Sequence, residues 1–270
     1  FLKTTLAASA TAALASPLHA AAGSAGASGR EYYDLRAYRL KAGASASLLD
    51  TYLEKALIPA LDKRGIKNVG AFSELDVNKN AGTSAPKPDT PVWVLIPHAN
   101  LESFASVNAE LNADAAVQKA GAEYLEVPKA NPAFERIDSW LLGAFAGYPK
   151  LQVPSFSKSR TPTRVFEMRD YQSHSELKAL SKMAMFNEGE IEIMKDLGMS
   201  PVFFGQALAG PDLPHLRYIT CAADLATHLA NWKKFSPDAR WVAMKDLPKY
   251  KENTSKNTAR FLTPKPFSAI

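Results

Sequence analysis

A six-residue sequence that occurs twice places the strongest limit on the folds open to this chain. Residues 33–38 read YDLRAY and residues 166–171 read FEMRDY, so both run aromatic, acid, aliphatic, Arg, variable, Tyr. The same separation of 133 positions (169 − 36) joins Gly65 to Gly198, and each glycine ends a predicted helix. The chain of 270 residues is therefore predicted to contain one domain written twice.

Each copy is followed by the same order of predicted elements. Apolar residues recur at helical spacing after the first strand, and alternating or continuous apolar runs bounded by Gly and Pro predict the other strands. The order βαββαβ predicts an α+β fold built from two tandem ferredoxin-like units. The predicted elements of the first repeat are strands 31–40, 68–77, 92–96 and 133–145 with helices 48–61 and 101–125. Those of the second repeat are the strand that carries residues 166–171, strands 201–208, 216–220 and 259–262, a helix at 177–194 and a last helical turn capped by residues 236–238.

Composition shifts set the domain borders. We expect a first domain at 31–145 and a second at 164–270, joined by a linker at 146–163 that has three prolines and no periodicity. Residues 78–91 are rich in Asn, Gly, Ser, Pro and Lys, which predicts a long exposed hairpin loop.

The first residues have the pattern of a secretory signal. Residues 1–22 contain an uncharged Ala-rich run and end with small residues at Ala20 and Ala22, as a cleavage site requires. The opening Phe-Leu-Lys resembles the end of a truncated twin-arginine motif, which predicts export to the periplasm or the extracellular space. A general secretory signal or an Ala-rich disordered tail is the alternative. Residues 23–30 are predicted to be a flexible leader.

Charge and motifs exclude several classes of function. The net charge of +5 is spread along the chain, whereas a nucleic-acid-binding protein would carry a basic stripe. The apolar run near the start is too short to span a membrane. The histidines have no metal-ligand spacing, and the chain has no phosphate-binding loop and no nucleotide fingerprint. We therefore expect no metal and no cofactor.

Short motifs resemble those of one known family, the NIPSNAP proteins. They are residues 33–38, Pro59 with Gly65, residues 70–72 and 134–136, and the second copy from Phe166. The resemblance covers residues 31–267 and implies units of the dimeric α/β-barrel kind, here with both halves in one chain. It implies that two sheets meet face to face and enclose a cavity. It implies no catalytic set.

Strand alternation groups the residues of the repeated sequence by face. Asp34, Arg36 and Tyr38 share one face of their strand, and the apolar residues between them share the other, which we expect to take the helices. The polar face would then line a barrel interior that holds a small anionic or phenolic ligand. Alternatively, each Arg pairs with a neighbouring carboxylate and only fixes how the sheets meet. The candidate ligand-binding residues are Asp34, Arg36, Tyr38, Glu167, Arg169, Tyr171 and His215.

Two classes of function stay open. The first is an exported small-molecule-binding or assembly module, with homo-oligomer formation left open. The second is a cofactor-independent enzyme, monooxygenase-like or isomerase-like, that acts on a small aromatic or oxygenated substrate. Such an enzyme needs a base in the cavity, for which the sequence offers Glu167, Tyr171 or His215.

Overall fold

The computed structural model describes residues 29–270 of the chain. The predicted signal at 1–22 and most of the predicted leader at 23–30 lie outside the described residues. Over the described part, no helix has the length and apolar character needed to cross a bilayer.

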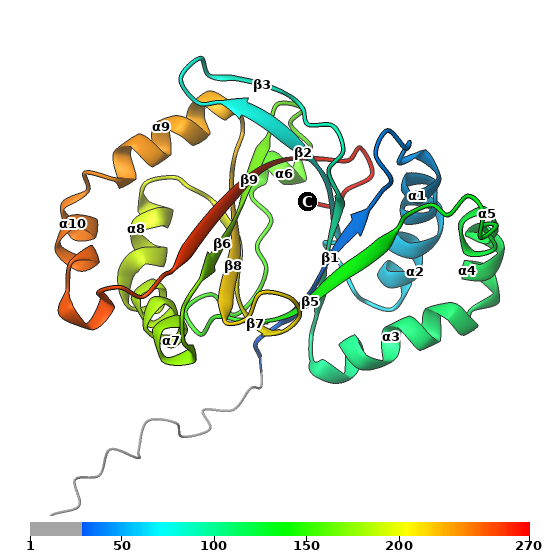
Figure 1. Cartoon of the computed structure of the whole chain (residues 1–270), viewed down its shortest axis with the longest axis horizontal. Helices are drawn as coiled ribbons and strands as arrows, with labels where there is room; N and C mark the ends of the chain where they lie inside the picture. The colour runs from blue at the N-terminus through cyan, green and yellow to red at the C-terminus, as the bar shows by residue number, and fades with distance from the viewer. Residues whose placement is uncertain (1–28) are drawn as a thin grey trace, which may run out of the picture.

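Eight antiparallel strands close into a barrel to which each repeat contributes four (Figure 1). The first repeat supplies the order β2-β4-β1-β5 and the second supplies β7-β8-β6-β9. Pairing of β5 with β7 and of β2 with β9 closes the ring, so the edges at which the two sheets would otherwise end are paired. The predicted fold of tandem ferredoxin-like repeats forming one α/β barrel is confirmed. The strands are β1 (Tyr32–Arg39), β2 (Gly70–Asn78), β3 (Thr83–Pro86), β4 (Val92–His98), β5 (Arg136–Ala144), β6 (Val165–Gln172), β7 (Pro201–Ala209), β8 (His215–Ala222) and β9 (Lys256–Pro264).

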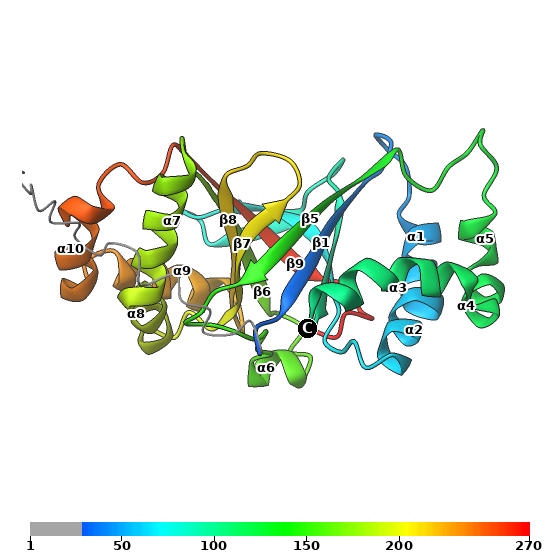
Figure 2. The same ribbon diagram turned by 90° about the horizontal axis from the view of Figure 1, so that it is seen from below.

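Two groups of helices cover opposite sides of the barrel, α1–α5 on one side and α7–α10 on the other (Figures 1 and 2). Each group buries an apolar stripe against the sheet of its own repeat. Each also contains a π-turn at the same place in the repeat, because η2 begins 133 residues after η1 (186 − 53). The helices are α1 (Ser47–Tyr52), η1 (Leu53–Leu57), α2 (Ile58–Lys63), α3 (Leu101–Ala113), α4 (Ala115–Ala120), α5 (Ala122–Leu125), α6 (Ser155–Lys158), α7 (Glu176–Met185), η2 (Phe186–Glu190), α8 (Ile191–Asp196), α9 (Leu225–Phe235), α10 (Ala239–Lys245) and η3 (Pro248–Tyr250).

The barrel interior is an apolar core, which corrects the sequence-based assignment of faces. Tyr33, Leu35 and Ala37 point into the barrel, where they pack with apolar side chains of the second repeat such as Phe203. The polar face of β1 lies instead against the helices, as the packing of Tyr38 with α1, η1 and α2 shows. The same holds in the second repeat.

The physical reason is the small diameter of the barrel. The interior of a closed eight-stranded barrel is just wide enough to be filled by side chains and is sealed by backbone on all sides. Apolar side chains therefore fill it at the least desolvation penalty. Between sheet and helices, Asp34 can stay buried because it accepts hydrogen bonds from Arg36 Nε at 2.7 Å and from Ser139 Oγ at 2.8 Å.

The two ends of the barrel differ. One end is closed by the segment after β5 and by the C-terminus, since Leu151 and Ile270 join the barrel core and Phe156 of α6 packs against it. Figure 2 shows α6 and the C-terminus together at this end. The opposite end carries polar residues, among them Glu74, Arg217 and Arg260.

Two segments predicted as irregular contain regular structure. Residues 83–86 in the predicted loop 78–91 form β3, which pairs with the end of β2 from Leu75 to Asn78. The predicted linker 146–163 contains the short helix α6. In both segments the backbone is ordered by pairing or by packing that their composition does not reveal.

Candidate functional site

A cavity of about 480 Å³ lies between the sheet of the second repeat and its helices. Four basic side chains and one acidic side chain line it, together with a group of aromatic rings, so its lining carries net positive charge. Most lining residues come from β6, β9 and the helices between them, and Lys79 reaches it from the turn after β2 of the first repeat. The principal lining residues are Lys79, Arg169, Tyr171, Lys182, Glu190, Trp232, Phe235, Trp241, Lys245, Tyr250, Asn253 and Asn257.

Arg169 is the central cation of this cavity. Its guanidinium carbon lies 4.3 Å from the centre of the Trp232 ring, which fixes one face of the group by a cation–π contact. The nearest carboxylate oxygen, Oε1 of Glu167, is 3.8 Å from Nη1. Among residues 29–270, Nε of Arg169 has no hydrogen-bond partner. A positive group that is held in place but poorly paired is suited to bind an anion.

Glu167 holds Trp232 behind the cavity. Its Oε2 accepts a hydrogen bond from Trp232 Nε1 at 2.6 Å, and Nε2 of His228 lies 2.8 Å from the same oxygen. Burial opposes the charge of Glu167, but the hydrogen bond from His228 and the charge of Arg169 outweigh it and lower its pKa. Glu167 does not line the cavity, so its role here is to position the ring on which Arg169 rests.

A buried ion pair forms another wall. Nζ of Lys182 in α7 lies 2.7 Å from Oε2 of Glu190 in the π-turn η2, and both residues are at most 5 % exposed. Burial raises the pKa of Glu190 in spite of the neighbouring lysine. The π-turn turns Glu190 toward Lys182, a placement in keeping with the frequent occurrence of such turns at functional sites.

Two phenols extend the wall toward the sheet. The hydroxyl groups of Tyr171 and Tyr218 are 2.9 Å apart, and the Tyr171 ring lies under Arg169 at 5.6 Å. Burial raises the pKa of Tyr171 to about 12. Both phenols are therefore neutral at physiological pH and act as hydrogen-bonding groups.

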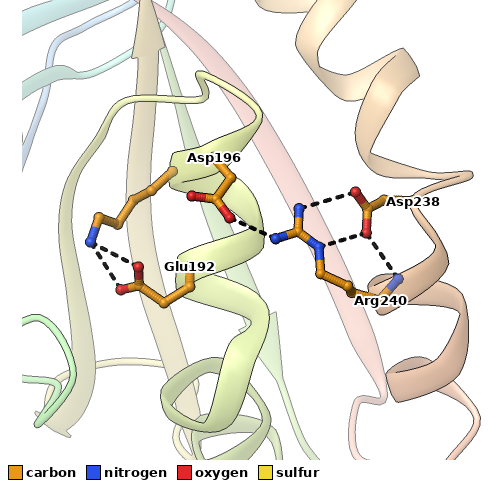
Figure 3. A network of polar contacts seen from close by, with 5 residues as sticks. Glu192, Asp196, Asp238 and Arg240 are labelled. Carbon is orange, nitrogen blue, oxygen red and sulfur yellow. Dashed lines mark hydrogen bonds and ion pairs between the residues drawn. The ribbon is translucent and has the colours of Figure 1, made fainter.

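An ion-pair network fixes the helix that closes the cavity. Arg240 of α10 pairs with both oxygens of Asp238, the N-cap of that helix, and with Asp196 at the end of α8 at 2.6 Å (Figure 3). Because Trp241 and Lys245 of α10 line the cavity, the network sets the position of two lining side chains.

The equivalent arginine of the first repeat, Arg36, is hydrogen-bonded to neighbouring side chains. Arg36 donates to Asp34 at 2.7 Å and to Asn108 Oδ1 at 2.9 Å, and it lies 3.5 Å from the Tyr38 hydroxyl. After the second strand the offset between the repeats falls to 124, because the following loop is shorter in the second repeat, and α3 and α9 therefore begin 124 positions apart (225 − 101). At this offset Asn108 occupies the position of Trp232 (232 − 108). The two arginines therefore share a strand position, but Arg36 lies in a closed polar network while Arg169 faces a cavity.

The residues predicted from the sequence fall into separate places. Arg169 and Tyr171 line the cavity, Glu167 lies behind it, and the trio of the first repeat lies between β1 and its helices. His215 lies on β8, with Nδ1 2.9 Å from the carbonyl oxygen of Asp212. Whether any of these residues binds a ligand stays a prediction.

Sequence reasoning missed several lining residues that the repeat could have revealed. At the offset of 133, Lys182 and Glu190 align with Leu49 and Leu57, which are buried core residues of the first repeat. Since Lys and Glu are almost never fully buried unless paired, charged residues at the positions of two core leucines indicate a local difference between the repeats. Lys79 had no such signal, because it belongs to the first repeat and reaches the cavity across the pairing of β2 with β9.

Comparison with known proteins identifies the second repeat. Residues 166–269 match the sequence model of the NIPSNAP family, so this part of the chain is a NIPSNAP domain, as its motifs predicted. A solved NIPSNAP family protein from Agrobacterium tumefaciens is 20% identical, with a TM-score of 0.35 over 39% of this chain and 96% of its own. A search of curated proteins finds no match to this chain.

Other solved structures cover both repeats. A candidate monooxygenase from Lactobacillus acidophilus is 7% identical, with a TM-score of 0.56 over 87% of this chain and 94% of its own. One from Fusobacterium nucleatum is 8% identical, with a TM-score of 0.51 over 87% and 92%. At this identity the likeness shows the fold alone.

Proposed function

We propose that the second repeat binds a small planar anion, such as an aromatic carboxylate, in the cavity between its sheet and helices. The observation that carries the proposal is the state of Arg169, which rests on Trp232 and whose nearest carboxylate oxygen, Oε1 of Glu167, is 3.8 Å away. A carboxylate would supply the missing hydrogen-bond acceptors in the forked geometry that a guanidinium favours.

The rest of the lining supports the same ligand class. Lys79 and Lys245 add positive charge, and Phe235 and Trp241 add apolar surface on which an aromatic ring can pack. The volume of about 480 Å³ falls in the range of small-molecule sites. The aromatic rings would contact the plane of the ligand while the cations bind its charged end.

Calorimetry with paired compounds tests this proposal. The wild type is titrated with benzoate and 2-naphthoate and with the corresponding neutral carboxamides. We expect the carboxylates to bind and the carboxamides to bind at least about tenfold more weakly, since they lose the charge-assisted contact. Equal affinity for acid and amide, or no binding of either carboxylate, would overturn the proposal.

The repeat supplies a matched control. Arg169→Met should weaken carboxylate binding by at least about tenfold, whereas Arg36→Met should leave it unchanged because Arg36 is engaged elsewhere. Thermal unfolding of both variants reports whether each is folded at the temperature of the titration. Retention of full affinity by Arg169→Met would contradict the proposed site.

Catalysis at the same cavity is the second candidate. Of the three bases that the sequence offered, only Tyr171 lines the cavity, and burial keeps it neutral. Glu190 is the one carboxyl group among the lining residues, so it is the general base that the lining offers. Measurement of oxygen consumption with dihydroxyaromatic compounds tests for catalysis. Turnover by the wild type that is lost in Glu190→Gln would favour catalysis over simple binding.

A further inference from the structure

A second cavity, of about 400 Å³, lies at the open end of the barrel, opposite the end that α6 and the C-terminus close. Both repeats line it, with Glu74, Trp93 and Trp140 from the first repeat and Arg217 and Arg260 from the second. Two hairpin loops border it, since Lys87 follows β3 and Asp212 lies in the loop between β7 and β8. It is separated from the first cavity because its residues lie on the opposite face of the sheet.

Arg217 is buried at this end with only part of its guanidinium paired. The residue is 2 % exposed, its Nε donates to Asp170 Oδ2 at 2.7 Å, and its guanidinium carbon lies 3.8 Å from the centre of the Trp140 ring. Among residues 29–270, its Nη1 has no hydrogen-bond partner. Burial lowers its pKa, so an additional anion would stabilise its charged form.

The inner charges of the cavity do not balance. Glu74 lies 3.5 Å from Lys87 and 3.7 Å from Arg260, and it accepts a hydrogen bond from Trp93 Nε1 at 3.0 Å. Arg217 has Asp170 as its carboxylate partner. A further lining carboxylate, Asp138, is paired at 3.3 Å with Arg39, which does not line the cavity. Lys87, Arg217 and Arg260 therefore share the carboxylates of Glu74 and Asp170, which leaves one positive charge in excess.

The rim of the cavity carries the opposite charge. Asp212 is exposed, and within the described part of the chain its carboxylate forms no ion pair. Trp140 is fixed between the two regions, because its Nε1 donates to the carbonyl oxygen of Pro211 at 3.0 Å. The cavity thus has a positive interior, an indole wall and a negative rim.

We propose that this cavity binds a small zwitterion of the amino-acid type. Its carboxylate would bind Nη1 of Arg217, its ammonium group would lie near Asp212, and its side chain would pack on Trp140. One carboxylate neutralises the inner excess charge, and one ammonium neutralises the rim. The site is independent of the anion-binding cavity of the second repeat.

Binding of L-leucine and L-phenylalanine, each compared with its amide and its N-acetyl derivative, tests the proposal by calorimetry. The amide lacks the carboxylate and the N-acetyl derivative lacks the ammonium group. We expect at least one free amino acid to bind and both of its derivatives to bind at least about tenfold more weakly. Absence of binding by both amino acids, or equal binding of the derivatives, would overturn the proposal.

Variants locate the site. The double substitution Arg217→Met with Asp170→Asn removes both members of a charge pair, so no buried charge is left unpaired. This double variant should not bind the amino acid. Arg169→Met, in the other cavity, should not change it. If the double variant does not fold, Asp212→Asn on the surface should weaken binding of the amino acid about tenfold and leave the N-acetyl derivative unaffected. Unchanged amino-acid affinity in Asp212→Asn would contradict the proposed orientation.

Discussion

At the scale of single residues, the buried pair of Lys182 and Glu190 is the clearest difference between the repeats, because the first repeat has Leu49 and Leu57 there. Desolvation of two charges offsets much of their attraction, whereas removing one leaves the other buried and unpaired. Glu190→Leu alone should therefore lower the free energy of unfolding by about 3 to 5 kcal/mol. Chemical denaturation measures this change.

The double variant provides the control. Lys182→Leu with Glu190→Leu restores the composition of the first repeat and should be within about 1 kcal/mol of the wild type, or more stable. A double variant as unstable as the single variant would show that the pair is needed for folding. Recovery of stability would indicate that the pair is kept for the chemistry of the cavity.

His98 makes a pH-dependent contribution to stability. Its side chain is fully buried at the end of β4, with Nδ1 3.0 Å from Ser103 Oγ, and burial lowers its pKa from 6.5 to about 4. The folded state therefore binds its proton less well than the unfolded chain does. Its contribution is complete above pH 6.5 and is lost as the pH falls toward 4, by about 2 kcal/mol at pH 5.

The measurement compares the free energy of unfolding at pH 7 and pH 5. In His98→Gln, which cannot titrate, the fall between these two values should be smaller by about 2 kcal/mol. Most carboxyl groups remain ionised in this interval and contribute little to the difference. An identical fall in variant and wild type would exclude His98 as the group responsible.

The candidate site was predictable from sequence only where residues lie in the repeated motif. Arg169 and Tyr171 were found in this way because strand alternation places them on one face. The assignment of that face to the barrel interior was wrong. The closed barrel is harder to fill with polar groups than the layer between sheet and helices, so the polar face lies against the helices. Trp232 lies outside the repeated motif, and its contact with Arg169 depends on where α9 crosses the sheet.

At the scale of elements, the position of α10 depends on contacts at its start. Arg240 joins the N-cap Asp238 to Asp196 of α8, while no residue of α10 is fully buried (Figure 3). A short helix with little buried surface needs such contacts to stay in place. Arg240→Ala should therefore increase hydrogen exchange throughout α10 and weaken anion binding in the adjacent cavity.

A neighbouring ion pair is the matched control. Lys195 pairs with Glu192 one turn away on the same helix, α8, at 2.9 Å, and connects to no other element. Lys195→Ala should leave both hydrogen exchange in α10 and anion affinity unchanged, since this pair lies within α8 and does not join α8 to α10. Equal effects of the two substitutions would argue against a specific role for Arg240.

Element order was predictable because each strand and helix has its own periodicity. The repeat offset then gave the βαββαβ order twice, and the π-turns η1 and η2 fall at the same offset. Strand β3 was missed because all four of its residues are exposed, so it has no apolar alternation to detect. Its order comes from pairing with β2.

At the scale of the whole molecule, the two repeats share one core. The barrel interior combines Leu35, Phe72 and Trp93 of the first repeat with Phe166 and Phe203 of the second. Neither repeat closes a barrel alone, because closure uses the β5–β7 and β2–β9 pairings between them. Each half by itself would expose two unpaired strand edges and one face of this core.

Separation of the halves should therefore cost each of them its stability. Fragments 29–150 and 151–270, expressed alone, should be aggregated or lack cooperative unfolding, whereas the two expressed together should form a 1:1 complex that unfolds in one transition. Native mass spectrometry and thermal unfolding measure these outcomes.

The uncut chain is the control, and it should unfold at a higher temperature because its halves do not have to associate. If either fragment were monomeric and as stable as the uncut chain, the barrel would be an association of independent domains and the open-end cavity, which both halves line, would have no fixed geometry.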